Sequence, residues 1–330
     1  MSEPQWSVGQ VERLLERLRE RRDGLPQLVL RGNPGAVPGL EAAVRSLASM
    51  TGGLLEMRTG DGREGELPGV VVRHPTRGEV GVWSARPVGP EAVPFLEFLG
   101  ASFAPIRPGA AGDGRPGRPW VEVLIAPGCP NCPRAVRAVA ELVADGIAAS
   151  LHVVDATVFP EEARRLGVTS VPVTVAGDLV LTGVRPGTGL ARHLESWGAR
   201  RWMEGVLEAH LQEGRVEAAA GLLGAGEALE AFVRLWGRST FSTRLGLLLA
   251  AETALEGSPR ALDDVVPELI GLLDSPDPPL RGDTADLLGS IGHPGARPAL
   301  ERLAADPDQE VAEAAREALD RLSPVRPERE

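Results

Sequence analysis

Two cysteines are the residues of this chain whose type and spacing are best suited to chemistry. Cys129 and Cys132 are the only cysteines among 330 residues, and they form one Cys-x-x-Cys motif. Such a pair can cycle between dithiol and disulfide when one thiol is activated. Half of a zinc site is the main alternative, but structural zinc takes four ligands, and the chain has no second cysteine pair and no histidines at ligand spacing. The motif therefore favours a redox-active dithiol without a bound metal.

The residues on either side of the motif predict how it is held. A β-branched and apolar run over 120–126 predicts a buried strand, and apolar residues at helical spacing from Val136 to Val143 predict a helix. The motif then lies where free N–H groups and the positive end of the helix dipole stabilise a thiolate. A thiol in such a place has a lowered pKa. We expect Cys129, the more N-terminal sulfur, to be the nucleophile and Cys132 to resolve the mixed disulfide.

Composition and charge narrow the class of protein. A chain of 330 residues with 43% hydrophobic content has room for two or three globular domains. Its net charge of −11 disfavours nucleic acid and anionic membranes as partners. The sequence predicts no signal peptide and no membrane span. We therefore expect a cytoplasmic location, and in a cytosolic protein cysteines confined to one motif indicate catalytic rather than structural disulfide chemistry.

The pattern of strands and helices before the motif recurs after it. Strand, helix and strand are followed in each region by an x-Pro step, two strands and a helix. The first region is expected to contain a helix after the capping box Ser7–Gln10, with Val8, Val11, Leu15 and Leu18 on one face, strands at 27–30, 54–57, 70–72 and 79–83, and helices around 40–47 and 91–99. The second is expected to contain strands at 120–126, 151–155, 173–175 and 179–181, and helices after the motif, around 161–166 and near 190–197. This recurrence suggests a tandem duplication in which Gly32–Gly35 stands where the second copy has its cysteines.

Beyond about residue 200 the strand signals stop and short helices follow as far as Leu322. Near the end the pattern repeats after 31 residues: Leu272, Pro276, Leu280, Leu288 and Ile291 are matched by Leu303, Pro307, Val311, Leu319 and Leu322. Paired helices with this period predict an α-solenoid.

The second region resembles thioredoxin-fold, glutaredoxin-like domains. Its Cys-x-x-Cys stands on a strand-to-helix turn, and Val171-Pro172 matches the cis-proline of that family. With a cysteine-free first copy, residues 8–197 resemble the N-terminal domain of the flavoprotein subunit of alkyl hydroperoxide reductase, which is similar to archaeal protein disulfide oxidoreductases. The resemblance implies that Pro172 shapes the loop packed against the dithiol, and that Glu91 is an acidic residue facing it. The C-terminal repeats resemble HEAT-like repeats.

The expected fold is therefore α/β, with tandem thioredoxin-like folds followed by an all-α HEAT-like solenoid. The expected domains are a degenerate thioredoxin-like fold without cysteines at 1–103, a Pro/Gly-rich linker at 104–119, a redox-active thioredoxin-like fold at 120–199, HEAT-like repeats at 200–323 and a tail at 324–330.

The resemblance implies a thiol–disulfide oxidoreductase that passes electrons from a flavoprotein to a peroxiredoxin. The flavin- and nicotinamide-binding region of the family has no counterpart, since no Gly-x-Gly-x-x-Gly follows a strand. We expect no bound cofactor, a separate flavoprotein reductase as electron donor, a disulfide-bearing protein such as a peroxiredoxin as substrate, and the repeats as a partner-binding platform. The alternative is a non-enzymatic adaptor or scaffold whose dithiol senses redox state.

Two acidic residues and one histidine leave alternatives open. Glu91 has two possible roles. In the first it accepts a proton from the cysteine pair or restrains its charge; in the second it is a carboxylate at the start of a helix that interacts only with the helix dipole. Glu122, within its strand, is either a buried acid near the thiols or a surface residue. His152 is expected to be structural.

Overall fold

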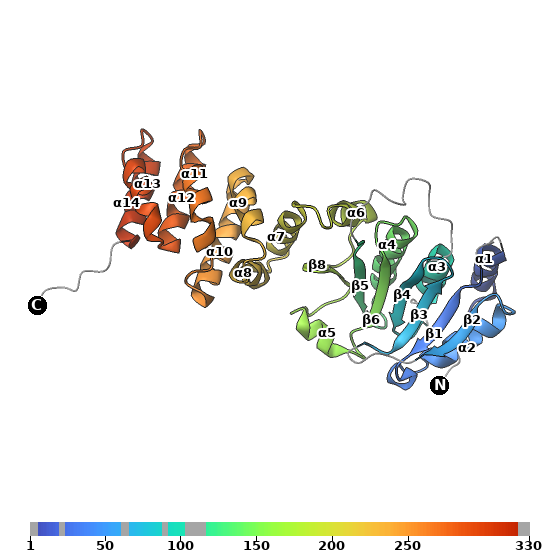
Figure 1. The fold of residues 1–330 in the computed structure, drawn as a ribbon. Helices are drawn as coiled ribbons and strands as arrows, with labels where there is room; N and C mark the ends of the chain where they lie inside the picture. The colour runs from blue at the N-terminus through green and yellow to red at the C-terminus, as the bar shows by residue number, and fades with distance from the viewer. Residues whose placement is uncertain (1–5, 20–23, 61–65, 88–91, 103–116, 323–330) are drawn as a thin grey trace, which may run out of the picture. The chain divides into compact units, whose positions relative to one another are not determined.

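The structure is a computed structural model, and the chain in it forms two compact units, Met1–Ala199 and Arg200–Glu330 (Figure 1). The first unit combines strands and helices, and the second consists of helices in its described part. The residues that the structure describes are 6–19, 24–60, 66–87, 92–102 and 117–322. The predicted linker at 104–119 and the tail at 324–330 therefore fall largely or wholly outside the described residues.

One eight-stranded sheet runs through the first unit in the order β2-β1-β3-β4-β6-β5-β7-β8. Its strands are β1 Gln27–Arg31, β2 Glu56–Gly60, β3 Gly69–His74, β4 Gly78–Ser84, β5 Trp120–Ile125, β6 Ser150–Asp155, β7 Val173–Ala176 and β8 Leu179–Thr182. Each half has one parallel pair, β1–β2 or β5–β6, followed by two antiparallel pairs. A parallel pairing of β4 with β6 joins the halves, with Val82 opposite His152. The two halves thus share one sheet and a common strand order.

Helices accompany this sheet, and all the described ones except Pro160–Arg165 bury apolar side chains. They are α1 Val8–Arg19, α2 Leu40–Met50, α3 Ala92–Ser102, α4 Cys132–Ala144, α5 Pro160–Arg165 and α6 Gly187–Glu195, with the 3-10 turn η1 Pro34–Ala36. Neighbours α1, α3, α4 and α6 pack in that order (Figure 1). Arg137 of α4 bonds to Glu97 of α3 with an Nε–Oε2 distance of 2.6 Å, which links the two halves a second time. The predicted capping box is present, with reciprocal bonds of 3.3 Å between Ser7 and Gln10.

Two local predictions in the first half are wrong. Val8 is 67% exposed. The buried face of α1 consists of Val11, Leu14 and Leu18, and Val8 lies on a different side of the helix. The strand predicted at 54–57 begins only at Glu56. Strand β2 lies at the sheet edge with half-exposed, mostly polar residues, so it lacks the apolar pattern that marks a buried strand.

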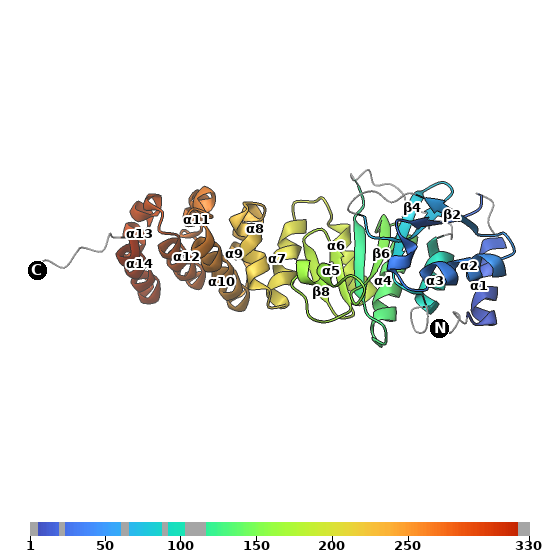
Figure 2. The ribbon, with the colours of Figure 1, turned by 90° about the horizontal axis from the view of Figure 1, so that it is seen from below.

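The second unit is a stack of paired helices around one continuous core. Its helices are α7 Trp202–Gln212, α8 Val216–Gly224, α9 Leu229–Arg238, α10 Phe241–Gly257, α11 Val266–Leu272, α12 Pro278–Ile291, α13 Arg297–Leu303 and α14 Gln309–Leu322, with the 3-10 turns η3 Asp263–Val265 and η4 Pro294–Ala296. Odd-numbered helices form one layer and even-numbered helices the other, and Figure 2 shows the pairs stacked in sequence order. None of the helices in the described ranges is long and apolar enough to cross a membrane.

Candidate active site

Strand β5 and helix α4 hold the two cysteines, as the sequence predicts. The strand ends at Ile125 and the helix begins at Cys132. Between them the Cys129 N–H donates to the Ala126 carbonyl at 3.2 Å, which closes the turn. Gly128, immediately before Cys129, has a φ of 80°, a left-handed conformation that favours glycine. The local sequence therefore forms a tight turn that places Cys129 at the N-terminal end of α4.

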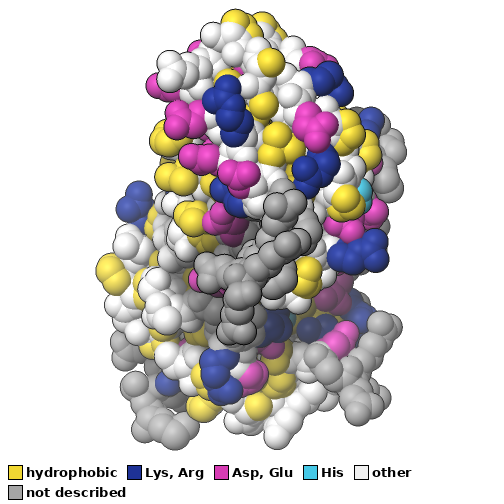
Figure 3. Space-filling model, turned by 90° about the vertical axis from the view of Figure 1, so that its left-hand side faces the viewer, with side chains coloured by type: hydrophobic (Ala, Val, Ile, Leu, Met, Phe, Trp, Pro, Cys, Tyr) yellow, Lys and Arg dark blue, Asp and Glu magenta, His cyan; other side chains and the backbone are white. Residues whose placement is uncertain are grey.

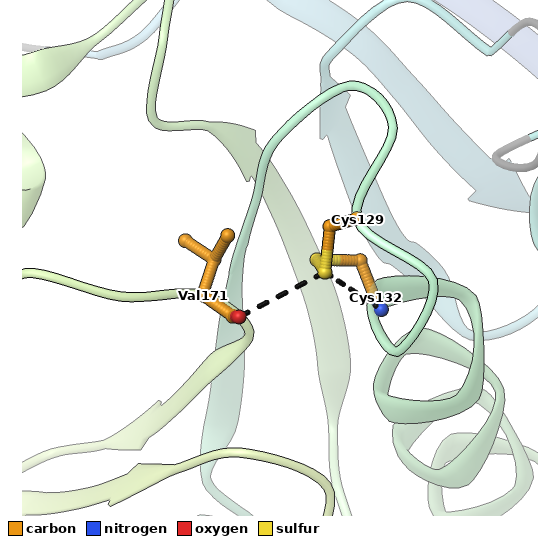
Figure 4. The surroundings of a disulfide bond; sticks show 3 residues. All are labelled: Cys129, Cys132 and Val171. Carbon is orange, nitrogen blue, oxygen red and sulfur yellow. Dashed lines mark hydrogen bonds between the residues drawn. A yellow bond between two sulfur atoms is a disulfide. The ribbon is translucent and has the colours of Figure 1, made fainter.

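The two cysteines differ in exposure. Cys129 and Cys132 form a disulfide with their Cα atoms 5.5 Å apart (Figure 4). Cys132 is fully buried, whereas Cys129 is half-buried. The Cys132 N–H donates to the Cys129 Sγ at 3.2 Å. Cys129 is therefore the sulfur that a partner can reach, and in the reduced protein the same N–H can stabilise its thiolate.

The loop before β7 lies beside the sulfur of Cys129. Antiparallel pairing of β5 with β7 sets Leu124 opposite Val173, so the residues just before β7 lie beside the end of β5. The Val171 carbonyl oxygen is 3.8 Å from the Cys129 Sγ (Figure 4). The Val171–Pro172 peptide bond is cis, Pro172 is buried, and its carbonyl accepts a bond from the Gly183 N–H at 2.8 Å. Pro172 thus stands in the loop where the sequence places it.

Glu91, the remaining candidate, lies outside the described residues, which resume at Ala92, the first residue of α3. Helix α3 packs against α4, the helix that begins at Cys132. That Glu91 faces the dithiol stays a prediction.

A row of polar side chains crosses the junction between the halves of the sheet. Ser84 Oγ of β4 lies 3.0 Å from His152 Nε2 of β6. On the other side of the ring, His152 Nδ1 is 3.6 Å from Glu122 Oε2 of β5. Arg165, at the end of α5, reaches Glu122 Oε1 with its Nη2 atom at 3.4 Å. His152 therefore links the halves, in line with the structural role expected for it.

Burial shifts the pKa of both central groups in this row. Glu122 is 3% exposed, and loss of solvation raises its pKa to about 7 although Arg165 acts in the opposite direction. The pKa of His152 is lowered to about 4, mainly by burial and further by the positive charge of Arg31. At neutral pH His152 is uncharged, and Glu122 titrates close to pH 7. The surface alternative for Glu122 is wrong.

The described residues offer little for a metal ion. No three side chains of His, Cys, Asp or Glu come together in the described ranges in a way that could hold one. A cavity of about 360 Å³ opens on the first half of the sheet, lined in part by Arg31, Arg58, Arg73, Glu66 and Glu79. Arg31 is already paired there with Glu66 at 3.4 Å, and neither cysteine lines this cavity.

Comparison with known proteins agrees with this division of the chain. Residues 120–195 match the family model of a thioredoxin domain, and residues 247–320 match that of HEAT repeats. The chain is thus a thioredoxin-fold α/β region followed by a helical region with HEAT repeats, as the sequence motifs predict.

Solved structures that are similar to the chain are distant in sequence. The NTD_N/C domain of alkylhydroperoxide reductase AhpF from Enterococcus faecalis is 16% identical with a TM-score of 0.48, over 58% of this chain and 100% of that one. A protein disulfide oxidoreductase from Aeropyrum pernix is 20% identical with a TM-score of 0.39, over 59% of this chain and 95% of that one. No curated protein matches the chain significantly.

Proposed function

We propose that this protein is a thiol–disulfide oxidoreductase that exchanges its Cys129–Cys132 pair with a disulfide in a partner protein. The observation that carries the proposal is the contrast between an accessible sulfur at a helix N-terminus and a fully buried one behind it. The thiolate of Cys129 attacks the partner disulfide, forms a mixed disulfide and releases one partner thiolate. Cys132 then attacks Cys129 Sγ, closes the internal disulfide and releases the second partner thiolate, so two electrons pass to the partner.

Two further residues are proposed to serve this exchange. Pro172 is a positioning residue, because its loop holds the Val171 carbonyl 3.8 Å from the attacking sulfur. An extended substrate segment can pair with the backbone of such a loop while its disulfide meets Cys129. Glu91 is proposed to face the dithiol and to exchange a proton with it or restrain its charge.

The electron donor and substrate are proposed from the sequence resemblance. We infer a separate flavoprotein reductase upstream, a peroxiredoxin as the first candidate substrate, no bound cofactor, a cytoplasmic location, and the HEAT repeats as the partner-binding platform. The shared strand order of the two halves supports a tandem duplication. Accordingly we propose a degenerate copy at 1–103 and a redox-active copy at 120–199.

Reduction of insulin disulfides in the presence of dithiothreitol tests this proposal. The wild-type chain should accelerate the reaction, and Cys129→Ser should abolish the acceleration because the attacking thiol is lost. Ser170→Ala, at an exposed position one residue before Val171, is the matched control and should retain it. A folded wild-type chain without turnover would favour the non-enzymatic adaptor instead.

A further inference from the structure

Helix α10 has a second apolar face that no described element covers. Its core-facing side carries the apolar residues Leu247, Ala250, Ala251 and Ala254, together with the buried Arg244, which is paired with Asp283. Phe241, Leu245 and Leu249 are instead 66%, 48% and 47% exposed. Their spacing of four residues places them on one line along the helix. A helix that is apolar on both sides is normally buried on both, so this stripe is suited to a contact outside the unit.

Among the described residues of the repeats, only α10 carries such a stripe. The described residues include seven exposed large apolar side chains, and three of them are on α10. Helix α14, in the same layer, exposes acidic residues instead: Glu310, Glu313 and Glu317. The apolar face of α10 is therefore a local feature and not a property of every repeat.

Negative charge is concentrated in the unit that carries the stripe. Residues 200–330 contain 24 acidic residues against 14 arginines, a net charge of −10, whereas residues 1–199 contain 22 against 21. Exposed Glu252 and Glu256 follow Leu249 by three and seven residues, so they continue the same face of α10 toward its C-terminal end. Figure 3 shows one face of the molecule, on which both acidic and basic side chains lie among apolar ones.

We propose that Phe241, Leu245 and Leu249, together with Glu252 and Glu256, form a docking surface for a basic amphipathic segment of a partner protein. Apolar side chains of that segment would cover the stripe, and its Arg or Lys residues would meet the acidic end of α10. The order of apolar and acidic residues along α10 fixes the direction in which the segment lies.

Charge selects this occupant over a second copy of the chain. Another copy would bring a second net charge of −10 to a surface that is already acidic, and like charges oppose association. The proposal rests on the helical unit alone and is independent of whether the dithiol is active.

Two labelled helical peptides test the proposal on the full-length chain by fluorescence anisotropy. Both carry leucine along one face, and the other face carries arginine in the probe and glutamate in its control. The wild-type chain should bind the arginine peptide more tightly than the glutamate peptide. Replacing Phe241, Leu245 and Leu249 together by serine should weaken arginine-peptide binding roughly tenfold or more, because three apolar contacts are lost. Val8→Ser/Met50→Ser, which removes exposed apolar side chains from the first unit, should leave binding unchanged.

Each of three results would overturn the proposal. The serine variant could bind the arginine peptide as tightly as the wild type does. The wild type could bind both peptides equally, which would remove the role of charge. The wild type could be a dimer that the serine variant dissolves, in which case a second copy covers the stripe. If the serine variant fails to fold, Glu252→Gln/Glu256→Gln decides: weaker binding of the arginine peptide supports the proposal, and unchanged binding refutes it.

Discussion

Glu122 makes the stability of the first unit depend on pH in a way that can be measured. Its pKa is raised from 4.5 to about 7 because burial disfavours the carboxylate. As pH rises between these two values, the unfolded chain releases a proton that the folded chain retains, so the free energy of unfolding falls. Each pH unit is worth about 1.4 kcal/mol, and the full loss above pH 7 comes to about 3 kcal/mol.

Replacing Glu122 by Gln removes this loss, since the amide has a similar shape and never ionises. At pH 5 the variant should be more stable than the wild type by less than about 1 kcal/mol, and at pH 8 by about 3 kcal/mol. The lost contact with Arg165, whose side chain is 54% exposed, reduces the gain by less than about 1 kcal/mol. His152 has the opposite dependence: with a pKa lowered from 6.5 to about 4, it destabilises the fold as pH falls below 6.5. That effect is common to both proteins and largely cancels in their difference.

Native-state hydrogen exchange of the peptide that contains β5, followed by mass spectrometry, measures the local opening free energy. Comparing the variant with the wild type at each pH removes the pH dependence of the intrinsic exchange rate. Glu141→Gln, an exposed carboxyl group on α4, is the matched control and should show no such trend. A difference between Glu122→Gln and wild type that stays constant from pH 5 to pH 8 would refute a buried, largely neutral Glu122.

An added Cβ at Gly81, where β4 meets β6, would lie 2.8 Å from the Leu151 carbonyl oxygen, so Gly81→Ala should lower the free energy of unfolding by roughly 1–3 kcal/mol in urea denaturation. Gly189→Ala, where nothing lies within 4 Å, should not destabilise and is its control. A chain ending at Ala199 should retain insulin reduction, because the dithiol and the Pro172 loop both lie in that compact unit. A folded fragment without turnover would contradict this prediction.

The dithiol and its flanking elements could be predicted from the sequence because their signals are local. A buried strand, a Cys-x-x-Cys and an apolar helical face follow one another within about 25 residues, and the structure has β5 and α4 at those places. The junction between the halves could not be predicted. Ser84 and His152 are 68 residues apart, and nothing in either segment specifies that β4 pairs with β6. Glu122 and His152 are single polar residues within apolar strands. They were the only features of the sequence that pointed to a row of polar side chains inside the sheet.

The sequence predicts short helices as far as Leu322 but does not mark out α10 among them, for a related reason. Its 17 residues carry apolar side chains on the core-facing side and on the exposed side, so they show no helical period that would mark one buried face. The later repeats were predictable because α12 and α14 recur 31 residues apart with prolines at matching positions. The surface now proposed for docking is therefore the part of the helical unit that the sequence pattern least reveals.

The adduct that each single-cysteine variant retains is the most direct test of whether Cys129 attacks and Cys132 resolves. With the Cα atoms of the pair 5.5 Å apart, Cys132 should resolve the mixed disulfide quickly in the wild type. Cys132→Ser lacks the resolving thiol, so after incubation with a disulfide substrate and gel filtration it should retain a stoichiometric adduct that dithiothreitol releases. Cys129→Ser, left with a buried sulfur, should retain almost none. If Cys129→Ser retains as much adduct as Cys132→Ser, or more, the assignment of the two sulfurs is contradicted.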